Sequence, residues 1–356
     1  MINSKLIGGF FELDLGPNLI ETNISLASYL ALPKDPGQTF INARSALFSF
    51  LSDQKFKKAW LPAYICSSVV DAFKESGTPF SFYCLDENLS PNVGFLDQKV
   101  QEKEVILAVN YFGRPPSPIF MDLIKRRRDI FYIEDCAHTI GATVNAWGDW
   151  RLFSPRKVAG VADGGYIVPA NLRHEIPSRK RLLPPRPPCP SAPHWAAPLL
   201  RYEDEGEEFN VAWHLENQRK EEGMRISNFI MSRLSREILK RLDAETLINQ
   251  RKRNYETLDK SLASISFLKE EICDFCPLGY VIRLPEEQRL VIRNLLIQKG
   301  IFPAIHWEKL PSPTDQFTSE HQLSKELLTL PCDHRYDTPA MQKVSDIIIE
   351  TVERLS

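Results

Sequence analysis

Short apolar runs that alternate with helix-like segments constrain the fold of this chain more than any other feature. Residues 105–111 and 130–135 are apolar runs that end in polar or aromatic residues, and residues 119–128 between them carry apolar side chains at helical spacing. Strands that are buried on both faces of a sheet have this continuous apolar character. Upstream, the alternation continues with two expected strands and two expected helices, at 58–62 and 80–84 and at 43–51 and 67–76. The pattern predicts an α/β fold with a mostly parallel central sheet flanked by helices.

The second part of the chain has a different pattern. Residues 224–262 carry apolar side chains at three- and four-residue steps, which predicts helical structure with a second long helix over 247–262. Further expected elements follow at 278–284, 286–299, 302–307, 328–333 and 339–355. We therefore expect a large domain over residues 1–215 and a smaller α+β C-terminal domain over residues 216–356.

Residues 183–198 form a proline-rich segment that carries seven prolines. Proline lacks a backbone N–H and fixes φ, so this composition excludes a regular helix or a central strand. Two interpretations stay open, a semi-rigid surface loop and a polyproline segment that binds a partner.

Composition excludes several function classes. The net charge of -2 gives no electrostatic signature for nucleic acid or an anionic membrane surface. No window approaches the ~18 consecutive apolar residues of a membrane span, and residues 1–11 lack the apolar core of a signal peptide. The seven scattered cysteines favour free thiols in a reducing cytoplasm. Cys273 and Cys276 form a single C-x-x-C pair without the further ligands of a zinc site, so no metal is expected.

Two residues indicate a specific cofactor chemistry. Asp135 ends an apolar run, and Lys157 leads into an Asp-Gly-Gly turn at residues 163–165. A lysine amine can hold pyridoxal 5'-phosphate (PLP) covalently, and a carboxylate can keep its pyridine nitrogen protonated. Lys157 and Asp135 are therefore the candidate catalytic residues. His138 either contacts the phenolic oxygen or a ring face of PLP, or is an ordinary core histidine.

The phosphate of the cofactor needs hydrogen-bond donors. Asn42, Ala43, Arg44 and Ser45 open a predicted helix, and a helix N-terminus offers free N–H groups and a positive dipole end. Ordinary helix capping by Asn42 is the competing interpretation. Ser154 either donates to the phosphate or caps a turn.

Aromatic and basic residues complete the predicted site. Tyr64 follows an expected strand and either stacks on the cofactor ring or packs on the core. Tyr111 stands at the next strand end and is a candidate for substrate binding, as are Arg156 and His306. His306 has the alternative of being an interior histidine of the small domain.

In this order, these motifs resemble those of the DegT/DnrJ family of PLP-dependent nucleotide-sugar aminotransferases, which have the fold-type I architecture. The resemblance covers nearly the whole chain: Asn42-Ala43-Arg44-Ser45-Ala46-Leu47 is similar to the family's Ser-Gly-Thr/Arg-x-Ala-Leu segment, and residues 134–138 to its Glu-Asp-Ala-Ala-Gln/His motif. Further matching segments are 62–64, 110–113, 157–165, 225–253, 301–307 and 328–333. Residues 8–15 and 154–157 are similar to those of a divergent branch.

The resemblance implies transamination from an amino acid, glutamate in the family pattern, to a keto-sugar nucleotide, in a homodimer with active sites at the subunit interface. This chain departs from the pattern at Asn42-Ala43, where the family has Ser-Gly, and at Leu152, where it has a phosphate-binding serine. Two alternatives therefore remain. One is another PLP reaction on a sugar, although the dehydrating members replace the lysine with histidine. The other is a PLP-fold protein with a degenerate site that binds a ligand or partner.

Overall fold

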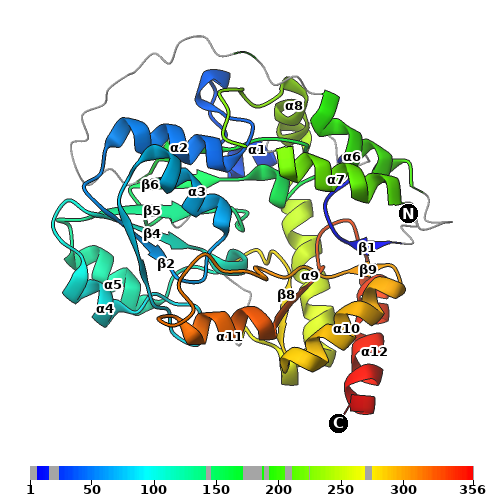
Figure 1. The fold of residues 1–356 in the computed structure, drawn as a ribbon. Helices are drawn as coiled ribbons and strands as arrows, with labels where there is room; N and C mark the ends of the chain where they lie inside the picture. The colour runs from blue at the N-terminus through cyan, green and yellow to red at the C-terminus, as the bar shows by residue number, and fades with distance from the viewer. Residues whose placement is uncertain are drawn as a thin grey trace.

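A layered α/β body joined to a smaller C-terminal unit makes up the computed structural model of the chain (Figure 1). The structure describes residues 6–15, 24–141, 146–170, 187, 192–204, 211–223, 225–268 and 275–355.

The α/β body is built on a six-stranded sheet with the strand order β3-β2-β4-β5-β6-β7. Five strands run parallel, and β7 is antiparallel to β6 at one edge. The predicted mostly parallel sheet is thus confirmed. The strand bounds are β2 Ala59–Pro62, β3 Phe80–Tyr83, β4 Val105–Val109, β5 Phe131–Asp135, β6 Trp150–Phe153 and β7 Tyr166–Pro169.

Alternating side chains of β4 show why this sequence needs helices on both faces of the sheet. Val105 and Leu107 pack in one apolar cluster with residues of α2 and α3, whereas Ile106 and Ala108 pack in another with residues of α4 and α5. Successive side chains of a strand point to opposite faces, so a continuous apolar run requires two covering layers. These helices are α2 Ala43–Gln54, α3 Ser67–Ser76, α4 Val93–Lys99 and α5 Pro118–Arg126.

The C-terminal unit has its own apolar core around an antiparallel pair, β8 with β10. Its β9 pairs in parallel with β1 at the start of the chain, so the N-terminal segment joins the two units. The elements are β1 Ile7–Gly8, α9 Ala244–Leu262, β8 Tyr280–Arg283, α10 Glu286–Gln298, β9 Ile301–Phe302, α11 Thr318–Glu326, β10 Leu327–Leu330 and α12 Thr338–Leu355. The domain boundary at 215/216 stays a prediction.

Helices α1 (Leu26–Tyr29) and α8 (Arg233–Arg241) contact each other. Both contribute to a cluster that also contains Val158, Val161 and Tyr166, so the segment that follows Lys157 is covered from this side. Single-turn 3₁₀ helices lie at η1 Pro36–Gln38, η2 Tyr111–Gly113, η3 Pro155–Lys157 and η4 Ala263–Ile265.

Two expectations from the sequence are corrected. Helix α6 (Ala192–Tyr202) occupies the end of the proline-rich segment, with Pro198 inside it, and pairs with α7 (Val211–Gly223). Proline at 198 removes one helical hydrogen bond, while Trp195 and Ala197 on the same helix are buried, and this burial offsets the loss. Most of residues 183–191 lie outside the described part of the chain. Residues 225–232 are not helical although their apolar spacing suggested it.

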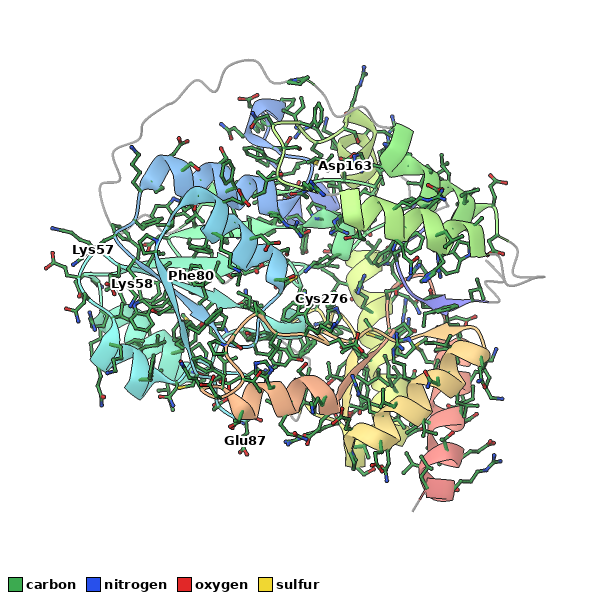
Figure 2. All side chains as sticks on the ribbon, in the orientation of Figure 1. Lys57, Lys58, Phe80, Glu87, Asp163 and Cys276 are labelled. Carbon is green, nitrogen blue, oxygen red and sulfur yellow. The ribbon has the colours of Figure 1, made fainter. Side chains whose placement is uncertain are left out.

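The side chains divide into a buried interior and an exposed surface. Cys276 and Asp163 lie in the interior, whereas Lys57 and Glu87 project from the surface (Figure 2). The described cysteines are free thiols, and the described residues contain no cluster of three or more metal ligands. Cys189 and Cys273 lie outside the described residues. No helix within the described ranges is long and apolar enough to cross a membrane.

Candidate active site

A cavity opens beyond the carboxyl ends of β4 and β5, beside the start of α2. The space between its walls is about 670 Å³, which includes volume open to solvent. Ligands of open α/β sheets bind at this edge because the loops that follow parallel strands meet there. The predicted site residues that line it are Asn42, Ala43, Arg44, Asp135, His138, Ser154, Arg156 and Lys157.

Asp135 is the last residue of β5 and is 4% exposed. Its Oδ1 accepts a hydrogen bond of 2.9 Å from the backbone N–H of Ala137, which fixes the carboxyl group at the cavity wall. Burial raises the pKa of Asp135, and the nearby Lys157 amine opposes this increase. Asp135 and Lys157 therefore interact electrostatically inside one cavity.

Lys157 is the last residue of η3, the 3₁₀ turn that follows β6 and begins after Ser154. Its Nζ lies 5.9 Å from the centroid of the Trp307 ring, and Trp307 also lines the cavity. The amine thus lies near an aromatic side chain of the C-terminal unit and interacts with the buried carboxyl group of the sheet.

His138 is 1% exposed and lies within a group of aromatic rings. Its ring stacks with those of Phe112 and Trp307 at centroid distances of 6.0 and 5.6 Å, and the His306 ring lies 5.1 Å away. Neither ring nitrogen of His138 has a hydrogen-bond partner among the described residues. Burial, together with Lys157 and His306, lowers the pKa of His138 well below its ordinary value. A neutral imidazole with an unused donor and an unused acceptor therefore faces the cavity, which suits a polar ligand.

The start of α2 is closely held by the chain itself. Asn42 Oδ1 accepts from the Ser45 N–H at 2.8 Å, as an N-cap does. A Cβ added at Gly165 would lie 2.1 Å from the Ala43 nitrogen, so only glycine permits this approach of the Gly164–Gly165 turn. Arg44 lies 3.6 Å from Asp71.

Four predicted residues do not line the cavity. Ser45 turns its Oγ to the Ser227 N–H, from which it accepts at 3.0 Å. Tyr64 and Tyr111 are buried outside the cavity lining. The Tyr64 hydroxyl donates to the His306 carbonyl, and the Tyr111 hydroxyl donates to the Tyr64 carbonyl. The His306 ring packs against those of Phe112, His138 and Trp307, and burial lowers the pKa of His306 to about 3.

Trp307 and Glu221 also line the cavity, and sequence reasoning missed both. Trp307 follows His306, so its position in the 301–307 segment was an available signal. Glu221 belongs to a run of charged residues on α7 and has no local signal. Its carboxylate is bound by Arg156, with Nη1–Oε1 and Nη2–Oε2 distances of 2.7 and 3.3 Å.

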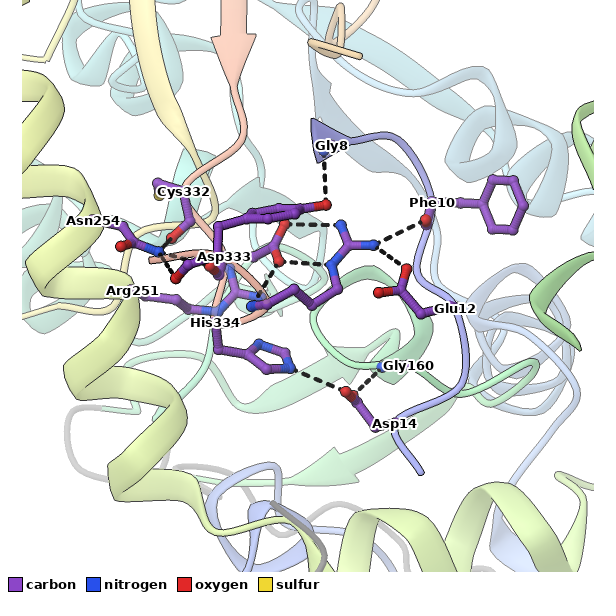
Figure 3. A network of polar contacts seen from close by, with 12 residues as sticks. Gly8, Phe10, Glu12, Asp14, Gly160, Arg251, Asn254, Cys332, Asp333 and His334 are labelled. Carbon is purple, nitrogen blue, oxygen red and sulfur yellow. Dashed lines mark hydrogen bonds and ion pairs between the residues drawn. The ribbon is translucent and has the colours of Figure 1, made fainter. Parts of the chain in front are cut away.

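The N-terminal segment supports the loop that follows Lys157 (Figure 3). Asp14 Oδ2 accepts from the Gly160 N–H at 2.5 Å, and Asp14 Oδ1 lies 3.3 Å from His334 Nε2. Nearby, Arg335 donates to Glu12 and to Asp333. This network connects residues of the C-terminal unit to the lysine-bearing loop.

No protein-family model and no curated protein matches the sequence. Solved structures do match the fold, and aminotransferases are among them. Spr1654 from Streptococcus pneumoniae, assigned as a sugar aminotransferase and solved in its PLP form, is 14% identical, with a TM-score of 0.66 over 98% of this chain and 94% of that one. The aminotransferase TlmJ from Streptoalloteichus hindustanus is 14% identical, with a TM-score of 0.63 over 100% of both chains. DesV from S. venezuelae, solved with a ketimine intermediate, is 15% identical, with a TM-score of 0.62 over 96% of this chain and 90% of that one. This protein therefore has the fold of these aminotransferases.

Proposed function

We propose that this chain is a PLP-dependent aminotransferase that moves an amino group from an amino acid, glutamate in our proposal, to a keto-sugar carried on a nucleotide. The observation that carries the proposal is the placement of Lys157 and Asp135 in one cavity beyond the sheet, on a fold shared with sugar aminotransferases. Because a fold alone does not define a reaction, the side chains of the site support the chemistry.

The donor set of the cavity fits PLP. Asp135 would hold the pyridine nitrogen, and His138, which has two ring nitrogens without partners in the described structure, would bind a polar substituent or cover a ring face. The start of α2 with Arg44, together with Ser154, would hold the phosphate. Trp307 would supply apolar contact to the cofactor or substrate.

PLP, when bound, supplies an electron sink that stabilises negative charge on the amino-bearing carbon. Lys157 would hold the cofactor covalently, and its amine, once released, would accept and then donate a proton as base and then acid. Asp135 remains ionised because the cation of the protonated pyridine offsets the cost of burial. His138 remains neutral and orients polar groups.

Nucleotide-sugar specificity, a homodimer and a cytoplasmic location complete the proposal. DesI, whose fold this chain shares at a TM-score of 0.61, was solved with its TDP-sugar product. Size-exclusion chromatography with light scattering measures the oligomeric state directly.

The absorption spectrum of the purified protein tests the proposal. PLP should give a visible band, borohydride should fix the cofactor to the peptide that contains Lys157, and glutamate should bleach the band. Lys157→Ala should abolish fixation, whereas Lys74→Ala, on the exposed surface of α3, should not change it. A wild-type protein that takes up no PLP refutes the proposal.

A second candidate, a binding module with a degenerate site, is favoured by the wall at the predicted phosphate end. Asn42 caps α2 with its own side chain, and Leu152 lines the cavity where the family pattern has a serine. PLP uptake without reaction with any amino donor would support this second function.

A further inference from the structure

Arg156 is the residue directly before Lys157, and its guanidinium lines the same cavity. A carboxylate already binds the Arg156 guanidinium, because Glu221 of α7 accepts from both of its terminal nitrogens in a bidentate pair. A planar guanidinium recognises a planar carboxylate through these two parallel hydrogen bonds, whether the carboxylate belongs to the protein or to a ligand. The pair therefore shows which kind of anion this position accepts.

The surroundings of the pair favour an anion. Lys157 and Lys220 both act electrostatically on Glu221, and Lys220 is 9% exposed. His194 of α6 also lies within the electrostatic range of Arg156 and Lys220. If Glu221 left, Arg156, Lys157 and Lys220 would lose a carboxylate that interacts with all three, so the position would favour another anion.

Glu221 is also well placed to leave. Its side chain is 44% exposed, and it stands two residues before the end of α7. The helix pair is anchored elsewhere, where Trp213 packs against Phe10 and Phe302 and Arg201 bonds the Gly8 carbonyl. Release of the Glu221 side chain therefore leaves these packing contacts in place, and a partly exposed ion pair costs less to break than a buried one.

We propose that Arg156 binds a carboxylate of the amino donor, and that Glu221 is an internal carboxylate that occupies this position until the donor displaces it. The inference rests on the proposed function and names its substrate class, a carboxylate-bearing amino donor. An amino acid carries its amino group and its α-carboxylate on one carbon, and the two side chains that would receive them, Lys157 and Arg156, line one cavity.

Calorimetric titration of the purified holoprotein with succinate, which binds without reacting, tests the proposal. Glu221→Gln should tighten succinate binding about tenfold, equivalent to about 1.4 kcal/mol, because the competitor loses its charge. Arg156→Gln should weaken binding at least tenfold, and Arg156→Lys should weaken it less. Glu216→Gln is the matched control, since Glu216 lies on the same helix and, among the described residues, its ion-pair partner is the exposed Arg219.

Unchanged succinate affinity in both Glu221→Gln and Arg156→Gln, with native circular dichroism and normal PLP uptake, overturns the inference while leaving the proposed function intact. Tightened binding of a nucleoside diphosphate but not of succinate in Glu221→Gln also overturns it, because the position would then recognise the acceptor. Absence of PLP uptake in the wild type would instead be a failure of the proposed function.

Discussion

Replacement of Asp14 by alanine should destabilise the protein strongly, because Asp14 links the loop that follows Lys157 to the C-terminal unit. The side chain accepts from the Gly160 N–H at 2.5 Å and pairs with His334 at 3.3 Å. Both partners are buried. Leaving a buried donor without an acceptor costs about 1–3 kcal/mol, so the loss of two such contacts should lower the free energy of unfolding by about 3 kcal/mol.

Urea denaturation followed by tryptophan fluorescence measures this change. Asp14→Asn should lose less, because an amide oxygen can still accept from Gly160. Asp122→Ala is the control: within the described part of the chain Asp122 pairs with the exposed Lys125, and its loss should cost at most about 0.5 kcal/mol.

Replacement of Asp14 should also change how the stability of the protein depends on pH. Burial by itself raises the pKa of Asp14, but His334 and the Gly160 N–H lower it to below its ordinary value. The stabilisation by Asp14 is thus complete above the ordinary carboxyl pKa and is lost as pH falls through the lower folded pKa. A loss in Asp14→Ala no larger than in Asp122→Ala, at neutral pH, would refute this reasoning.

Three further predictions follow from the packing and the charges. Gly165→Ala should destabilise the protein by at least about 2 kcal/mol and weaken PLP binding, because its Cβ meets the Ala43 nitrogen at 2.1 Å, whereas Gly94→Ala in α4 should be neutral or slightly stabilising; thermal melts compare the two. Arg251→Leu should cost about 3 kcal/mol in urea denaturation, since the fully buried guanidinium donates to the Val158 and Pro277 carbonyls. Burial lowers the pKa of Lys220 from 10.5 to about 8. The free energy of unfolding of the wild type should therefore rise, relative to that of Lys220→Met, by up to about 3 kcal/mol between pH 8 and pH 10.5. A constant difference over this range would contradict the shift.

Local patterns predicted the α/β body well, because short apolar runs and helically spaced apolar residues mark each strand and helix within a few residues. The helix Ser67–Ser76 was predicted to the residue, and the strand that ends at Asp135 was placed correctly. The helix at residues 192–202 was not predicted, since proline content argues against a helix while its buried Trp195 argues for one only after folding.

The sequence by itself determined the sheet, the carboxylate at its edge and the lysine before a glycine turn, since these depend on residue type and short spacing. Only the tertiary structure decided that Trp307 lies near the Lys157 amine, that His138 is stacked and without a hydrogen-bond partner among the described residues, and that Glu221 binds Arg156. The contacts of Trp307 with Lys157 and His138, and of Glu221 with Arg156, join residues 65 to 169 positions apart, so they depend on how whole units pack.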